Sequence, residues 1–402
     1  MTTASSTSTE FTDDHISIRV LLPVFLLMTL LGANAGWTGP LLPSLAKDQS
    51  VSLVDVSKMI SVNFLGCILS LLFGRFLMNS LGGWNCQKLS AILFAAGLLV
   101  IATVSGLTWI CVGALLIGIG GGINSFSSTV VVLCMAKGST SAVLNRLHLF
   151  YGLGALLGPA IAWLGTMTPW TYRAVFLLGA VLVSLIAVEF FAGAKCRPAV
   201  ETKEAQSSWG IVKSPTLWMY SLVMFLYVGI ETATVTWLYT YLQKAEHLSA
   251  GLSSLGVSAL WGGLTLGRLL GVPLCVKFKG YYVTVGGVCL ATVGMALLAW
   301  GPSCGFPCWM MFFAILCVGT GFGPVFPNVL AAANTRFAHA ATTTTTVSIL
   351  CGFVGGMIFA PVLAKIFENA GLSQGFMTLV GCLIALIFTF IVTRKIATST
   401  TN

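Results

Sequence analysis

Glu231 is the residue whose type and position point most directly to chemistry. It lies near the middle of a long apolar stretch, in the segment Phe225-Leu-Tyr-Val-Gly-Ile-Glu231. Inserting a carboxylate at the centre of a membrane helix costs about 2.5–3.5 kcal/mol, so such a group should be protonated, paired or in contact with a water-filled cavity. A group of this kind suits a proton carrier, and the alternative is a structural hydrogen bond to a neighbouring helix.

Two other ionisable residues lie within apolar stretches. Arg268 could bind an anionic substrate or pair with Glu231, but we favour a structural or gating role in which it donates to backbone carbonyls. His148 lies about one turn into the fifth stretch. A proton relay is one option for it, and a capping or gating histidine is the favoured one.

Side-chain amides and aromatic rings supply the other candidate site residues. Neutral amides donate and accept at once, which suits a polyhydroxylated neutral solute, although they also join membrane helices. Tyr227 lies four residues before Glu231. A sugar site uses such an arrangement, because the ring packs on C–H groups while the carboxylate binds hydroxyls. Asn63 and Asn145 belong to the amide set, and the residues predicted to bind substrate are Asn34, Asn124, Tyr227, Glu231, Trp237, Trp261 and Asn328.

Twelve apolar stretches must position these residues. Each is roughly 20 residues or longer, enough for a helix to cross about 30 Å of hydrocarbon. The chain is 57% hydrophobic and 8% charged, whereas soluble domains carry about 25% charged residues. The predicted spans are 20–43, 55–79, 87–106, 109–135, 143–166, 173–194, 215–242, 251–275, 282–300, 308–332, 342–365 and 374–393.

The distribution of positive charge predicts the orientation. With these spans, fourteen of the 20 Lys and Arg residues lie on the side of the termini, five lie on the other side, and Arg268 lies within a span. Loops rich in Lys and Arg stay cytoplasmic, so both termini should be cytoplasmic in a multi-pass protein of the cell (inner) membrane. This asymmetry explains the net charge of +9 without a nucleic-acid partner. The acidic N-terminal tail lacks the features of a cleaved signal peptide.

The longest polar gap, Lys195 to Ser214, divides the chain into two halves of six spans. The predicted fold is an all-α membrane protein with twelve transmembrane helices in two pseudo-symmetric six-helix bundles. We expect a disordered cytoplasmic tail over 1–19, bundles over 20–194 and 215–395, a cytoplasmic linker over 195–214 and a cytoplasmic tail over 396–402.

Motifs recur between the halves at a nearly constant spacing. A Gly-x-Gly-x-Gly motif at 118–122 matches another at 319–323, 201 residues later. Asn34 matches Glu231, which lies 197 residues later. These spacings indicate duplication of a six-helix unit, which is typical of alternating-access transporters that bind substrate between their halves near mid-membrane. We interpret the glycine motifs as packing faces, since neither is followed by the Lys-Ser/Thr of a phosphate loop.

The cysteines and the remaining motifs predict no catalysis. We find no catalytic triad, metal spacing or nucleotide motif, so we expect no enzyme activity, no metal and no cofactor. Cys304 and Cys308 share one predicted outer loop and could pair in an oxidising compartment, although free thiols are the favoured interpretation.

The chain resembles the major facilitator superfamily over nearly its whole length. Within it, four segments are similar to the fucose–galactose–glucose:cation symporter group, which implies a sugar or sugar-like substrate and proton or sodium coupling. The general motif after the second span is degenerate, with Asn79 where the family usually has Asp. The four segments are Leu147 to Pro159, Tyr227 to Glu231, Trp261 to Arg268 and Gly323 to Pro327.

One departure from that group concerns the coupling residues. Its proton-coupled members place acids in the first and fourth spans, where this chain has Asn34 and Asn124. Glu231 is therefore the main candidate for coupling, unless sodium is the coupling ion or coupling is absent.

The expected function is secondary active transport of a small polar solute by a monomer in the lipid bilayer. A proton-coupled efflux antiporter is the alternative, since Gly154-x-x-x-Gly158-Pro159 resembles the antiporter motif of drug exporters. A third option is a non-transporting membrane sensor.

Overall fold

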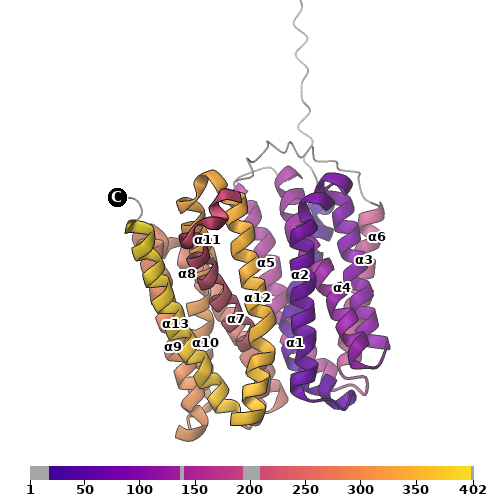
Figure 1. Ribbon diagram of the computed structural model, residues 1–402. Helices are drawn as coiled ribbons and strands as arrows, with labels where there is room; N and C mark the ends of the chain where they lie inside the picture. The colour runs from indigo at the N-terminus through magenta and orange to yellow at the C-terminus, as the bar shows by residue number, and fades with distance from the viewer. Residues whose placement is uncertain (1–17, 136–139, 193–208, 400–402) are drawn as a thin grey trace, which may run out of the picture.

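The computed structural model describes residues 18–135, 140–192 and 209–399 (Figure 1). Twelve helical segments in these ranges are long and apolar enough to cross a membrane. The predicted twelve-span, all-helical fold is therefore confirmed. Parts of the predicted tails and linker lie outside the described ranges. They are the first seventeen residues of the N-terminal tail, residues 195–208 of the linker and the last three residues of the C-terminal tail.

The helices of the first half are α1 (Ile18–Asp48), α2 (Leu53–Leu81), α3 (Gly83–Thr103), α4 (Leu107–Met135), α5 (Thr140–Thr166) and α6 (Tyr172–Ala192). The second half contains η1 (Trp209–Lys213), α7 (Pro215–Lys244), α8 (Ala250–Lys277), α9 (Gly280–Cys304), α10 (Cys308–Phe322), α11 (Val325–Arg336), η2 (Ala338–Ala340), α12 (Ala341–Ala370) and α13 (Leu372–Ser399). Most helices extend beyond the predicted spans, because backbone hydrogen bonding continues after the apolar residues end.

The sequence predicted the tenth span as one continuous helix, and the structure differs. The span is divided into α10 and α11 at Gly323 and Pro324. Proline lacks the amide hydrogen that an α-helix needs, and its ring clashes with the preceding turn, so the helix ends there and a new one begins. The last residues of the predicted linker also form a short helix, η1, whose Ile211 packs in a small apolar cluster with Leu217 and Phe337.

The helix neighbours repeat between the halves, which lie side by side in Figure 1. In the first half α1 packs on α5, α4 packs on α2 and α3, and α3 packs on α6. In the second half α7 packs on α12, α10 packs on α8 and α9, and α9 packs on α13. The correspondence pairs α1 with α7, α2 with α8, and α5 with α12. This pseudo-symmetry is the structural counterpart of the repeated motifs.

The two Gly-x-Gly-x-Gly motifs make equivalent helix contacts. A Cβ atom at Gly118 or Gly122 of α4 would overlap α2, and one at Gly120 would overlap α3. In the motif at 319–323, Gly319 of α10 and Gly323 directly after it face α8, and Gly321 faces α9. Only glycine lets the helix backbones approach this closely. The interpretation of these motifs as packing faces is confirmed.

Glycines also join α1 to α5. Gly32 and Gly36 of α1 lie against the backbone of Tyr151 and Ala155, while Gly154 of α5 lies against the backbone of α1. The fifth-span segment that resembles an antiporter motif therefore packs on α1. In the second half, Gly355 of α12 approaches α7 in the corresponding way.

Candidate functional site

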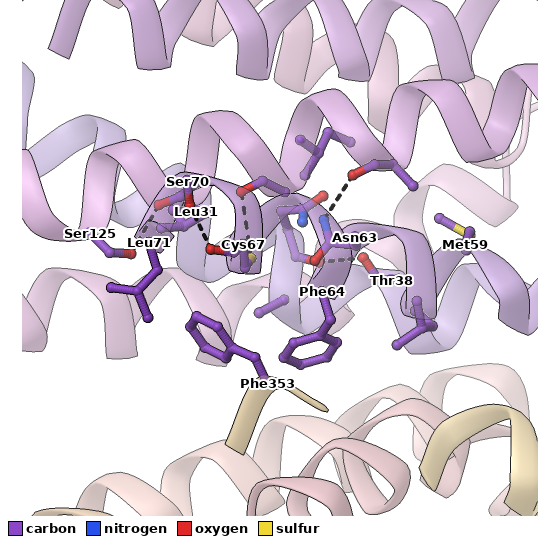
Figure 2. Close-up of a pocket in the computed structure, with 18 of the residues that line it drawn as sticks. Leu31, Thr38, Met59, Asn63, Phe64, Cys67, Ser70, Leu71, Ser125 and Phe353 are labelled. Carbon is purple, nitrogen blue, oxygen red and sulfur yellow. Dashed lines mark hydrogen bonds between the residues drawn. The ribbon is translucent and has the colours of Figure 1, made fainter. Parts of the chain in front are cut away.

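A cavity of about 560 Å³ lies between the two halves and extends into the first one. In Figure 2, Asn63, Cys67 and Ser70 of α2 lie along one side, and Phe353 of α12 approaches from the second half. The lining residues are Leu31, Asn34, Ala35, Thr38, Gly39, Met59, Ile60, Asn63, Phe64, Cys67, Ser70, Leu71, Ala114, Ile117, Gly118, Gly121, Gly122, Ser125, Phe126, Tyr151, Phe176, Val235, Thr236, Thr345, Ile349 and Phe353.

The cavity reaches toward the side of the membrane on which α1 begins and α13 ends, which we call the terminal side. Ser70 and Leu71 lie in the half of α2 nearer this side, and Thr345 lies close to the start of α12. The opposite, or far, side is closed by contacts between the halves. The cavity therefore extends toward the terminal side, and contacts between the halves lie on the far side.

Two hydrogen bonds contribute to the far-side closure. The Ser61 hydroxyl of α2 donates to the carbonyl oxygen of Met357 in α12 at 2.6 Å. The Ser258 hydroxyl of α8 donates to the carbonyl oxygen of Leu156 in α5 at 2.9 Å. The serines are 197 residues apart and the acceptors 201 residues apart, so the two bonds are equivalent under the internal repeat. We call this pair of bonds the serine clasp.

The contact between α1 and α7 also follows the repeat. Gly39 of α1 lies against the backbone carbonyls of Val235 and Thr236 in α7. Gly39 and Thr236 are themselves 197 residues apart. Equivalent positions of the two halves thus meet at the far end of the cavity.

Asn34 and Asn63 both line the cavity, and both are half-buried. Asn34 Oδ1 accepts from the indole N–H of Trp37 at 3.2 Å. Asn63 Nδ2 donates to the carbonyl oxygen of Ala114 at 3.1 Å. These partners fix the orientation of each amide, since an indole N–H needs an acceptor and a carbonyl needs a donor.

Glu231 is half-buried on α7 and lies within electrostatic reach of α5 and α8. Glu231 interacts electrostatically with Arg268, and the Tyr227 hydroxyl lies close to the Glu231 carboxyl group. Tyr151, which lines the cavity, interacts electrostatically with both Glu231 and Arg268. Among the described ranges, Glu231 and Arg268 form no ion pair with each other. His148 is exposed on α5 and also lies within reach of the Arg268 charge.

Several predicted aromatic residues have structural partners. Tyr227 is fully buried and donates to the Phe322 carbonyl of α10 at 3.0 Å, and Trp237 is fully buried and donates to the Ala360 carbonyl of α12 at 2.8 Å. Trp261 is 6% exposed, and its ring contacts Tyr151 edge-on at 6.2 Å.

Of the seven predicted substrate-binding residues, Asn34 lines the cavity. The other six lie outside its lining in this state, so their binding roles stay predictions. Asn124 is buried with its Nδ2 3.5 Å from the sulfur of Met28. Asn328 is on α11, where it donates to the Gly280 carbonyl at 3.4 Å. The side chain of Asn145 lies outside the described part of the chain.

The described residues hold no group of three His, Cys, Asp or Glu side chains placed to bind a metal. Cys304 and Cys308 are both exposed free thiols. Sequence reasoning missed the two serines of the clasp and the ring pair of Phe64 and Phe353. The 197-residue spacing of Ser61 and Ser258 is the signal that would have found the clasp.

The match of the chain to a family model decides its identity. The model of the Major Facilitator Superfamily matches residues 24–361. The chain belongs to the Major Facilitator Superfamily. The resemblance drawn from the sequence is thus confirmed at the level of the superfamily, and the protein is an integral, multi-pass membrane transporter.

Several known proteins are similar to this chain over most of its length. The chain is 26% identical to Bypass of stop codon protein 6 of Saccharomyces cerevisiae over 345 residues, covering 77% of this chain and 68% of that protein. A point mutant of the nucleoside transporter NupG has a TM-score of 0.79 at 14% identity, covering 93% of this chain and 99% of that one. A point mutant of the E. coli fucose:proton symporter FucP has a TM-score of 0.62 at 17% identity, covering 93% and 98%. Both structural likenesses show the fold.

Proposed function

We propose that the protein transports a small polar solute, a sugar or sugar-like compound, by alternating access with proton or sodium coupling. The cavity between the halves carries this proposal. Its volume of about 560 Å³ lies within the usual range for ligand pockets. Its described lining contains amides, hydroxyls and apolar groups and no formal charge, which suits a neutral solute with hydroxyl groups.

Glu231 supports coupling in the same region. It is half-buried on α7, close to Tyr227 and within reach of the Arg268 charge. A transporter that couples a neutral solute to a proton needs a group that binds and releases the proton as access alternates. Sodium could instead bind the same carboxylate.

A proton-coupled efflux antiporter is the second candidate. The specific observation in its favour is the large apolar share of the cavity wall, which includes Leu31, Ile60, Phe64, Ile117 and Phe353. Such a wall also accommodates hydrophobic drugs or metabolites.

Transport by the purified protein in liposomes distinguishes the two. With an imposed inward proton or sodium gradient, we expect radiolabelled D-glucose, L-fucose or D-xylose to accumulate above its equilibrium level, and the accumulation to stop when an ionophore dissipates the gradient. Gradient-driven extrusion of ethidium without uptake of any sugar would favour the antiporter. Absence of both activities would contradict transport of either class.

The positive-charge asymmetry supports a cytoplasmic location for both termini and the linker. A membrane-impermeant maleimide should label native Cys304 and Cys308 in intact cells, because both thiols are exposed on the far side. Gly210→Cys, at an exposed position of η1, should react only after permeabilisation. Buried Cys86 is the unreactive control. Labelling of Gly210→Cys in intact cells, with Cys304 and Cys308 protected, would reverse the topology.

A further inference from the structure

The cavity is distributed unevenly between the two halves. Residues of α1, α2 and α4 form most of its wall, and the second half contributes only Val235, Thr236, Thr345, Ile349 and Phe353 among the described residues. None of those five is an amide or an ionisable residue. Thus the first half supplies both amides and most of the hydroxyls of the wall, whereas Glu231 is in the second half.

The two amides in this wall present complementary free atoms. Asn34 Oδ1 is occupied by Trp37, and Asn63 Nδ2 is occupied by the Ala114 carbonyl. Within the described chain, Asn34 Nδ2 and Asn63 Oδ1 have no hydrogen-bond partner. A ligand therefore meets a donor from α1 and an acceptor from α2, with no charged side chain in the wall.

Apolar groups complete this half of the site. The rings of Phe64 on α2 and Phe353 on α12 lie 5.8 Å apart at the boundary between the halves. Gly118 and Gly121 of α4 also line the cavity, and their lack of a side chain lets α4 pack directly against Asn63 of α2 and Leu31 of α1. The wall can thus contact one apolar face of a ligand while the amides bind its polar groups.

We propose that the amides of the first half select the substrate, by binding an uncharged, partly apolar solute through Asn34 Nδ2 and Asn63 Oδ1, while the second half carries coupling. This inference rests on the proposed transport function and deepens it. The required solute has at least one hydrogen-bond acceptor and one donor. Hydroxyl-bearing compounds such as glycosides meet this requirement, and phosphorylated sugars do not, because the wall offers their charge no counter-ion.

Binding of defined probes tests the inference. Purified protein is titrated with phenyl β-D-glucopyranoside, which is neutral and partly apolar, and with glucose 6-phosphate. Asn34→Leu and Asn63→Leu should each raise the Kd of the glucoside about tenfold, the loss expected for one buried hydrogen bond. Gln243→Leu is the control, because it removes a half-buried amide of the second half that lies outside the cavity lining, and it should leave the Kd within about twofold of the parent.

A second measurement needs no variant. Cys67 lines the cavity one turn after Asn63, whereas Cys304 is exposed at the far-side end of α9 in the second half. The glucoside should slow the alkylation of Cys67 by N-ethylmaleimide, measured by peptide mass spectrometry, and leave the alkylation rate of Cys304 unchanged. This comparison remains decisive if either Asn variant fails to fold.

The outcomes separate the inference from the transport proposal. Equal Kd values in the parent and both Asn variants, or an unchanged Cys67 rate at saturating glucoside, overturn the inference while binding itself stands. Tighter binding of glucose 6-phosphate than of the glucoside also overturns it. Failure of every neutral probe to bind the parent, in a protein that extrudes ethidium, overturns the sugar proposal and the inference with it.

Discussion

Glu231→Gln should abolish gradient-driven accumulation of substrate while leaving substrate exchange largely intact. Glutamine has nearly the shape of a protonated glutamate but cannot release a proton or bind sodium as a carboxylate does. Glu231 lies in reach of the Arg268 charge and of Tyr151, a residue of the cavity wall, so its charge state can respond to both the substrate and the opening of the halves. Exchange requires only the loaded transporter to alternate, and the neutral variant can do so.

The measurement compares net uptake under an imposed gradient with exchange at equal concentrations, in the same liposomes. Glu246→Gln is the matched control, since Glu246 is a half-buried acid in the loop between α7 and α8, next to Tyr241. We expect accumulation by Glu231→Gln to fall to the level of empty liposomes and the control to accumulate as the parent does. Accumulation by Glu231→Gln equal to that of the parent would make Glu231 structural and place coupling elsewhere.

Removing the serine clasp should open the far side. Ser61→Ala and Ser258→Ala each eliminate one hydrogen bond between the halves, and a net contribution of about 1 kcal/mol each makes a total of about 2 kcal/mol. The double variant should therefore shift the equilibrium between the two access states about 30-fold toward the far-side-open form. Because the two bonds are equivalent under the repeat, the two single variants should have similar, intermediate effects.

A reporter cysteine in the cavity measures this shift. Thr38→Cys lies on the far-side half of α1 and lines the cavity, so its reaction with an impermeant maleimide added on the far side reports opening there. Ser184→Ala is the control, because the Ser184 hydroxyl donates within α6 to Ala180 at 2.7 Å and joins no second helix. Unchanged reactivity of the reporter in the double variant would show that helix packing alone, including Gly39 on α7, closes the far side.

Some properties of this protein follow from local sequence. A membrane helix must satisfy its own backbone hydrogen bonds in hydrocarbon, so each crossing requires a long apolar run that can be counted directly. The glycine motifs at 118–122 and 319–323 could likewise be assigned to helix contacts, because in a membrane small residues are what allow close approach. The 197-residue match of Asn34 and Glu231 indicated the repeat. Domain boundaries and the roles of the predicted site residues stay predictions.

Other properties depend on how the helices rotate and pack. The helices are apolar on nearly all sides, so periodicity does not say which face of α7 meets the cavity. Tyr227 and Trp237 have the composition of a sugar site, yet their polar atoms bond to carbonyls of α10 and α12, the partners that packing brings within reach. The free atom of Asn63 was likewise set by packing, because Asn63 Nδ2 donates to the Ala114 carbonyl of α4. The sequence by itself determined the number of crossings, the repeat and the acid within α7, because these depend on composition and order along one chain. The tertiary structure alone decided which polar atoms face the cavity and which residues close the far side, because both depend on how the helices rotate and pack against one another.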